Sequence, residues 1–163
     1  MFADSEALIF LGLYALLCVL CGVLALIDLR RGIIPDGLNL SIAGLGLVKA
    51  AISGGAAAGI EAAGEAVVIG AIFWLLQRLY FVLRKTDGLG FGDVKFLAAA
   101  GTWIGIAGVP TLLLIASLTA LAAAGGLQLA GRQMSRQTSL PFGPFLAMGL
   151  LLTPVLQQWL EII

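Results

Sequence analysis

The stretch Ala7–Ile27 reads ALIFLGLYALLCVLCGVLALI and contains no charged side chain. A helix needs about 20 predominantly apolar residues to cross the hydrocarbon core of a bilayer, so this stretch predicts a membrane-spanning helix. The residues before it, Met1–Glu6, are acidic where a signal peptide would be basic. We therefore expect the helix to stay attached as the first span of the protein.

Five further apolar segments follow, and we expect an all-α, polytopic membrane protein built as a bundle of about six transmembrane helices. The further segments are Leu38–Ile52, Ala62–Leu83, Val94–Val109, Thr111–Ala130 and Phe145–Leu160. Hydrophobic residues make up 61% of the chain and charged residues only 11%, whereas about a quarter of a soluble domain is charged. No polar stretch is long enough for a second domain, so residues 1–163 are expected to form one membrane domain. We expect Ser53–Gly59 to be a flexible loop and Gly105–Pro110 an uncharged turn.

The basic side chains fall almost entirely on one side of this six-helix arrangement. They are Arg30, Arg31, Arg78, Arg84, Lys85, Lys95, Arg132 and Arg136, and only Lys49 falls in the outward half of a segment. Basic residues concentrate on the cytoplasmic side of membrane proteins. The sequence therefore predicts a multi-pass protein of the inner (plasma) membrane with both termini on the non-cytoplasmic side.

The composition excludes several kinds of chemistry. The chain has no histidine, which removes Ser-His and Cys-His catalysis and the commonest ligand of catalytic zinc. Cys18 and Cys21 alone cannot complete a tetrahedral zinc site, and we interpret them as small hydrophobic residues that pack in a helix. No basic cluster interleaved with aromatic residues indicates nucleic-acid binding. We expect no metal ion and no other cofactor.

Two aspartates at the predicted cytoplasmic edge are candidate functional residues, because ionisable groups at membrane depth are costly. Asp28 ends the first segment, where a carboxylate opposes the helix dipole, although a structural pair with Arg30 or Arg31 remains an alternative. Asp93 ends the glycine-rich stretch GLGFGD at residues 88–93. It could simply cap the following helix, but a loop stripped of side chains beside a carboxylate also suits a bound peptide.

Two further aspartates on this side have simpler structural interpretations. Asp36, between Pro35 and Gly37, suits the start of a helix, and Asp87 lies in an ordinary turn. Two carboxylates that share a proton can hydrolyse a peptide bond without histidine or metal. Asp28 and Asp93 are the pair that the sequence favours for this chemistry.

Three stretches, in this order, resemble the motifs of the type IV prepilin peptidase family. They are DLRRGIIPD at 28–36, GFGDVK at 90–95 and LPFGPFL at 140–146. The middle stretch is similar to the G-x-G-D-x-K motif of that family, whose G-x-G-D core presenilin-type proteases share. The three motifs span most of the chain, and the number of predicted helices matches that of the family. The long members of the family carry an additional cytoplasmic domain with paired cysteines, and this chain is closer to the short forms.

The resemblance implies an aspartic endopeptidase that removes the leader peptide of prepilin or pseudopilin precursors at the cytoplasmic side of the membrane. It implies that Asp28 and Asp93 are catalytic. Supporting roles would fall to Pro35, Asp36, Gly90, Gly92 and Lys95, of which Lys95 has an alternative as one more cytoplasmic positive charge. Methyltransferase activity is not expected, and the third motif favours a pilus or type II secretion system. The expected partners are the precursors and the lipid bilayer.

Two alternatives from other classes use the same carboxylates. One is a small proton-coupled transporter, and the other is a structural membrane subunit in which both aspartates only cap and pair. A transport relay is expected near the middle of the bilayer, whereas Asp28 and Asp93 both lie at its predicted edge.

Overall fold

The computed structural model describes residues 2–85, 89–130 and 141–162, which form four helices and no strand. The helices are α1 (Phe2–Arg31), α2 (Asp36–Arg84), α3 (Phe91–Leu129) and α4 (Gly143–Ile162). The all-helical prediction is confirmed for these residues. Helix α1 is longer than the apolar run that predicts it, because it also includes Asp28, Arg30 and Arg31.

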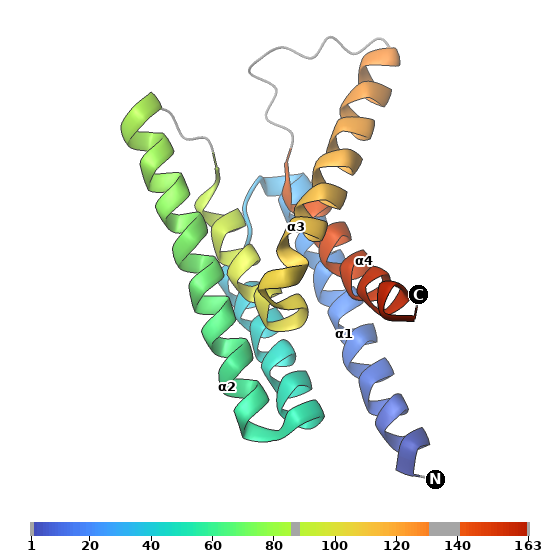
Figure 1. Cartoon of the computed structure of the whole chain (residues 1–163). Coiled ribbons are helices and arrows are strands. Elements are labelled where there is room, and N and C mark those ends of the chain that lie inside the picture. The colour runs from blue at the N-terminus through green and yellow to red at the C-terminus, as the bar shows by residue number, and fades with distance from the viewer. Residues whose placement is uncertain (1, 86–88, 131–140, 163) are drawn as a thin grey trace.

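Helices α2 and α3 are each divided by glycines that leave the helical conformation. In α2 these are Gly54 and Gly55, and in α3 it is Gly105. Figure 1 shows that the chain turns back at both places, so that each long helix consists of two segments lying beside each other. Because α2 has 49 residues and rises about 1.5 Å per residue, an unbroken α2 would be about two and a half times as long as a bilayer core is thick.

The two predicted connections are therefore shorter than expected. Within Ser53–Gly59 only the two glycines are non-helical, since Gly55, with φ of 73°, turns the chain and the alanines after it favour helix. Within Gly105–Pro110 only Gly105 is non-helical. The predictions of a loop of seven residues and of a segment continuing to Val109 were wrong, because a single glycine with positive φ is enough to reverse the chain.

The break at Gly105 (the Gly105 break) exposes backbone groups that side chains from other helices satisfy. Lys49 Nζ donates to the carbonyl of Trp103 at 3.1 Å, and Gln157 Nε2 donates to the carbonyl of Ile104 at 3.3 Å. The N–H of Ile106 lies 3.4 Å from a carboxylate oxygen of Glu65. Non-helical backbone inside a membrane protein persists only where such partners are available.

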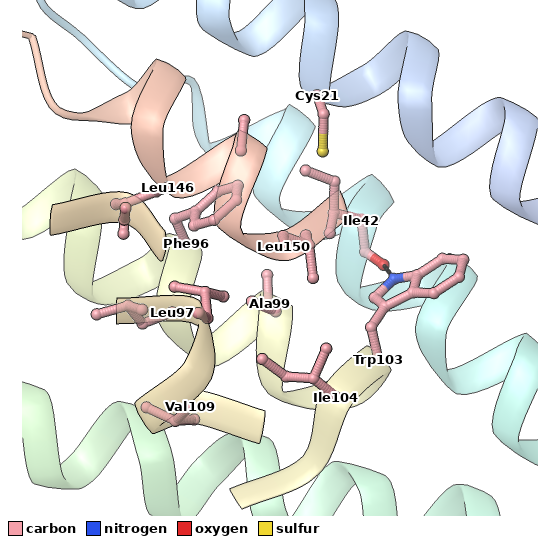
Figure 2. Packing of buried hydrophobic residues seen from close by; sticks show 14 of the residues in the cluster. Cys21, Ile42, Phe96, Leu97, Ala99, Trp103, Ile104, Val109, Leu146 and Leu150 are labelled. Carbon is pink, nitrogen blue, oxygen red and sulfur yellow. Dashed lines mark hydrogen bonds between the residues drawn. The ribbon is translucent and has the colours of Figure 1, made fainter. Parts of the chain in front are cut away.

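Buried residues from all four helices form one core, with α3 contributing the largest share (Figure 2). Leu17, Cys21 and Leu24 of α1 and Leu146 and Leu150 of α4 are completely buried in it. Trp103 of α3 lies across the core and donates its indole N–H to the carbonyl of Ile42 at 2.8 Å, as Figure 2 shows. The core therefore joins the two halves of the chain in one unit.

Glycine lets α2 and α3 approach closely. A Cβ on Gly46 would lie 2.0 Å from Thr102 Oγ1, and a Cβ on Gly101 would lie 3.3 Å from the Cα of Ala66. In a bilayer, helices associate largely through such close packing of backbone and small residues. Part of the glycine content therefore serves the packing of α2 against α3.

The outer surface of the bundle is apolar. Three helices in the described part of the chain are long and apolar enough to cross a membrane: Ala7–Arg31 of α1, and α2 and α3 as a whole. Large side chains such as Leu8, Leu40, Val67 and Leu83 are mostly exposed on them. Exposed apolar surface of this extent suits contact with lipid rather than with water.

Candidate active site

The first candidate carboxylate, Asp28, lies in the last turn of α1 and is only 5% exposed. The helix ends because Gly32 adopts a left-handed conformation, with φ of 64°, and donates its N–H to the carbonyl of Asp28 at 2.7 Å. A glycine in this conformation commonly terminates helices. The sequence prediction that Asp28 sits at a helix C-terminus is confirmed.

The partner of the Asp28 carboxylate comes from the start of α4. The backbone N–H of Gly143 donates to Asp28 Oδ2 at 2.8 Å, in a buried contact. A hydrogen bond of this kind, between a helix N-terminus and a carboxylate, is stronger than one between neutral groups. The sequence analysis did not single out Gly143, although this residue is part of the motif LPFGPFL at residues 140–146.

The second candidate carboxylate, Asp93, is the third residue of α3. The residue that caps the helix is Gly90, whose carbonyl accepts the N–H groups of Asp93 and Val94 at 3.1 and 3.3 Å. Asp93 therefore lies in the first turn of α3, three residues after the N-cap residue Gly90. A Cβ on Gly90 would lie 3.1 Å from Asp93 Oδ2, so this glycine keeps the space beside the carboxylate open.

Gly92 brings the start of α3 against the connection between α1 and α2. A Cβ on Gly92 would lie 3.1 Å from the Cβ of Ile34. Because any larger residue would push the two apart, Gly92 helps to place Asp93 beside the end of α1. Ile34 is a second residue that the sequence did not single out.

Asp36 and Lys95 form an ion pair across the same region. Lys95 Nζ lies 2.7 and 2.9 Å from the two carboxylate oxygens of Asp36, which is the first residue of α2 after Pro35. The pair joins the start of α2 to the first turn of α3. Lys95 is thus more than a free charge at the membrane edge, because its ammonium group binds a particular carboxylate.

One cavity of about 830 Å³ contains both candidate carboxylates. It lies at the end of the bundle where α1 ends and where α2, α3 and α4 begin. Its lining includes Asp28 of α1, Asp93 of α3, the pair Asp36–Lys95, and Pro141 and Phe142 before α4. We call these residues the cavity end of the bundle.

The charges in this cavity are unbalanced. Lys95 is the one cation among the described residues that line it, and it binds Asp36. Asp28 and Asp93 therefore line the cavity without a cation of their own among these residues. Asp87, the fourth aspartate on this side, lies outside the described residues.

No group of three or more histidine, cysteine, aspartate or glutamate side chains that could hold a metal ion occurs in the described residues. Cys18 and Cys21 are both free thiols. Cys21 is completely buried in the core, as expected, whereas Cys18 is exposed on the outer face of α1. The packing interpretation therefore holds for Cys21 and was wrong for Cys18.

Comparison with known proteins places these features in a family. The sequence matches the profile of the type IV leader peptidase family over residues 15–125. It is 38% identical over 135 residues to the prepilin leader peptidase/N-methyltransferase of Burkholderia pseudomallei strain 1026b, covering 82% of this chain and 42% of that protein. It is 37% identical over 149 residues to the protein of the same name from Escherichia coli K12, covering 90% of this chain and 65% of that protein.

A shorter relative matches over nearly the whole of both sequences. Leader peptidase HopD of Escherichia coli is 38% identical over 139 residues, which cover 85% of this chain and 86% of HopD. The chain thus spans less than half of the Burkholderia relative and most of HopD. No solved structure matches the chain. The resemblance seen in the motifs is confirmed, and the chain belongs to the type IV leader peptidase family.

Proposed function

We propose that this protein is an intramembrane aspartic endopeptidase that removes the leader peptide of type IV prepilin or pseudopilin precursors. The observation that carries the proposal is that Asp28 and Asp93, from helices far apart in sequence, line one cavity. Family membership supports the reaction class, and the names of the relatives support the class of substrate. The transporter alternative has no support among these relatives.

The chemistry follows from two carboxylates that share one proton. The ionised carboxylate accepts a proton from water while the water oxygen attacks the carbonyl carbon of the scissile bond. The protonated carboxyl donates its proton to the carbonyl oxygen, which gives a tetrahedral intermediate. When the C–N bond breaks, the leaving nitrogen receives a proton from the carboxyl that took one from water. The other carboxylate takes a proton from a hydroxyl of the intermediate as the new carboxyl group forms, so that the pair again holds one proton. No metal ion enters this sequence, and general acid–base assistance of this type contributes about 10²- to 10⁴-fold to the rate.

The shape of the cavity supports a peptide as the substrate. Its volume of about 830 Å³ is within the range of about 300–1,000 Å³ that is usual for ligand sites. Gly90 and Gly92 keep side chains away from one wall beside Asp93, so that an extended backbone can approach the carboxylate. Pro35 immediately precedes α2, and the ion pair of Asp36 with Lys95 joins the start of α2 to the first turn of α3 within the lining of the cavity.

The membrane arrangement that fits this function has six spans with the cavity on the cytoplasmic side. The two breaks divide α2 and α3 into four segments, which with α1 and α4 make the expected number. Arg30 and Arg31 lie in the last turn of α1, and Arg84 and Lys85 end α2, so that these basic residues lie on the side of the bundle where the positive-inside rule requires a cytoplasmic face. Both termini would then face away from the cytoplasm, and the protein would reside in the inner membrane.

The test is cleavage of a pilin-like precursor by the purified full-length protein in lipid vesicles, followed by the change in gel mobility and by mass spectrometry of the new N-terminus. We expect Asp28→Asn and Asp93→Asn each to reduce leader removal by about 10²- to 10⁴-fold. Glu61→Gln is the matched control, because it also removes a carboxylate but lies away from the cavity. Cleavage at the rate of the unaltered protein by either aspartate variant would sink the two-aspartate mechanism.

A chelator arm separates this mechanism from metal-assisted hydrolysis. The protein is treated with a chelator and then assayed with and without added Zn²⁺ or Mg²⁺. We expect the same rate in all samples. Activity that disappears with the chelator and returns with a metal ion contradicts the proposal, even if both aspartates prove essential.

A further inference from the structure

The motif LPFGPFL at residues 140–146 has no part in the two-carboxylate chemistry. Its glycine, Gly143, nevertheless contacts the carboxylate of Asp28. At the start of α4, the N–H groups of Phe145 and Leu146 both donate to the carbonyl of Phe142 at 3.1 Å. Pro144 has no N–H to offer. The N–H of Gly143 is therefore a donor that α4 itself does not use, and it donates to Asp28 Oδ2.

The contact requires glycine for reasons of space. A Cβ on Gly143 would lie 2.6 Å from Asp28 Oδ2 and 2.9 Å from its Cγ. Gly143 is not among the residues with positive φ, so its backbone conformation alone would accept another residue. What an added methyl group would displace is the carboxylate of Asp28.

Helix α4 is held against α1 at a second point. The hydroxyl of Tyr14 donates to the carbonyl of Leu151, two turns further along α4. Leu146, Ala147 and Leu150 between these points are buried in the core. The start of α4 is consequently fixed relative to Asp28 by packing along the helix.

The hydrogen bond also distinguishes the two oxygens of Asp28. An N–H can donate only to a lone pair, so Oδ2 accepts this bond in both protonation states of the pair. Because an oxygen that already accepts an N–H is the less basic of the two, a proton held by Asp28 is favoured on Oδ1. The other charged side chains of the cavity are Asp93 of α3 and the ion pair of Asp36 with Lys95. None of them takes the place of the Gly143 N–H as a hydrogen-bond donor to Asp28, because Lys95 binds Asp36.

We propose that Gly143 is a positioning residue, whose N–H holds Oδ2 of Asp28 and leaves Oδ1 to exchange protons with water and substrate. The motif around Gly143 thereby acts as the support of the first catalytic carboxylate. This inference rests on the proposed function for its kinetic consequence, but the position of the carboxylate can be tested without cleavage.

The kinetic test compares two glycines of α4 that are equally crowded. A Cβ on Gly143 would lie 2.6 Å from Asp28 Oδ2, and a Cβ on Gly149 would lie 2.6 Å from the carbonyl of Leu112. We expect Gly143→Ala to lower kcat on the order of 10²-fold with little change in KM, since small displacements of a reacting group have effects of that size. Gly149→Ala is expected to lower thermal stability and leave kcat of the folded protein unchanged. An unchanged kcat in Gly143→Ala, or an equal loss in both variants, overturns the inference.

A second variant covers the case in which Gly143→Ala does not fold. Replacing residue 143 by glycolic acid turns the amide into an ester, which removes the N–H and adds no side-chain atom. We expect kcat to fall at least tenfold while KM stays the same. A full kcat in this ester variant means that the hydrogen bond does not position Asp28.

Chemical labelling tests the same contact when no precursor is cleaved. A small epoxide, which alkylates carboxylates, is added to the unaltered protein and to the variants, and the label on Asp28 is measured by mass spectrometry. We expect several-fold more label on Asp28 in Gly143→Ala and in the ester variant than in the unaltered protein or in Gly149→Ala. Equal labelling in all four overturns the inference, whereas a labelling change without any precursor cleavage contradicts only the proposed function.

Discussion

The cavity end and the Gly105 break both contain charged side chains beside glycines, but they use the charges differently. At the Gly105 break, Lys49, Glu65 and Gln157 each reach a backbone group that the break has freed. At the cavity end, Asp28 and Asp93 face a cavity of about 830 Å³. A polar side chain in a membrane bundle is thus structural when its role ends with a backbone group, and available for chemistry when it also lines a cavity, as Asp28 does beside its contact with Gly143.

The largest effect that this contrast predicts is a difference in cleavage rate between variants of the two acidic residues Asp93 and Glu65. Asp93→Asn is expected to reduce precursor cleavage by about 10²- to 10⁴-fold, because the amide can neither accept nor release the shared proton. Glu65→Gln keeps an oxygen acceptor for the N–H of Ile106 and is expected to cleave at nearly the unaltered rate. Initial rates in lipid vesicles, normalised to the amount of folded protein, measure both. Comparable losses in the two variants would remove the functional distinction between the two regions.

The second prediction concerns the stability of the Gly105 break. Gly105→Ala is expected to lower the free energy of unfolding by about 1–3 kcal/mol, because residue 105 has a φ of 65° and an added Cβ would lie 2.9 Å from Glu65 Oε2. Thermal unfolding in detergent measures the effect. Gly22→Ala is the matched control, since nothing lies within 4 Å of an added Cβ there. The cleavage rate of folded Gly105→Ala should remain near that of the unaltered protein.

A smaller effect is expected at the ion pair beside the candidate carboxylates. Lys95→Met leaves Asp36 as an additional unpaired negative charge in the cavity, and we expect kcat/KM to fall about fivefold. The double variant Asp36→Asn with Lys95→Met removes both charges and should recover most of the loss. A double-mutant cycle on kcat/KM separates the pair's interaction from the effect of each residue. If the double variant is no better than Lys95→Met, then Lys95 acts on the substrate directly and not through Asp36.

The smallest effect is expected at Cys18, which belongs to neither region. It is exposed on the outer face of α1 as a free thiol. Cys18→Ser should change the free energy of unfolding by less than about 0.5 kcal/mol and leave cleavage unchanged. Cys21→Ser, which places a hydroxyl in the core at a completely buried position, is the informative contrast and should be clearly less stable. Equal melting temperatures for the two variants would contradict the burial difference between them.

Much of the fold could be predicted because membrane helices are local features of the sequence. A run such as Ala7–Ile27 is helical in lipid whatever surrounds it, since every backbone group must find a partner within the segment. The connections were harder to predict, as Gly55 and Gly105 illustrate. Glycine and small residues occur throughout this chain, and composition does not reveal which single glycine takes a positive φ and turns the chain.

The candidate site was predictable only in part. Asp28 and Asp93 were found from the sequence because a carboxylate is unfavourable at a helix C-terminus and because glycines flank the other one. The partners were not found, since Gly143 follows Asp28 by 115 positions and Lys95 follows Asp36 by 59. No local pattern encodes such contacts.

The sequence by itself determined that this protein is a helical membrane bundle with two candidate functional carboxylates at one of its ends. Hydrophobicity and the local fit of each residue to its helix are sufficient for that. Only the tertiary structure decided that the carboxylates share one cavity, that Lys95 is bound by Asp36, and that Gly143 holds Asp28. The reason is that these features depend on how closely the helices approach and in which register, which the packing of the whole core sets.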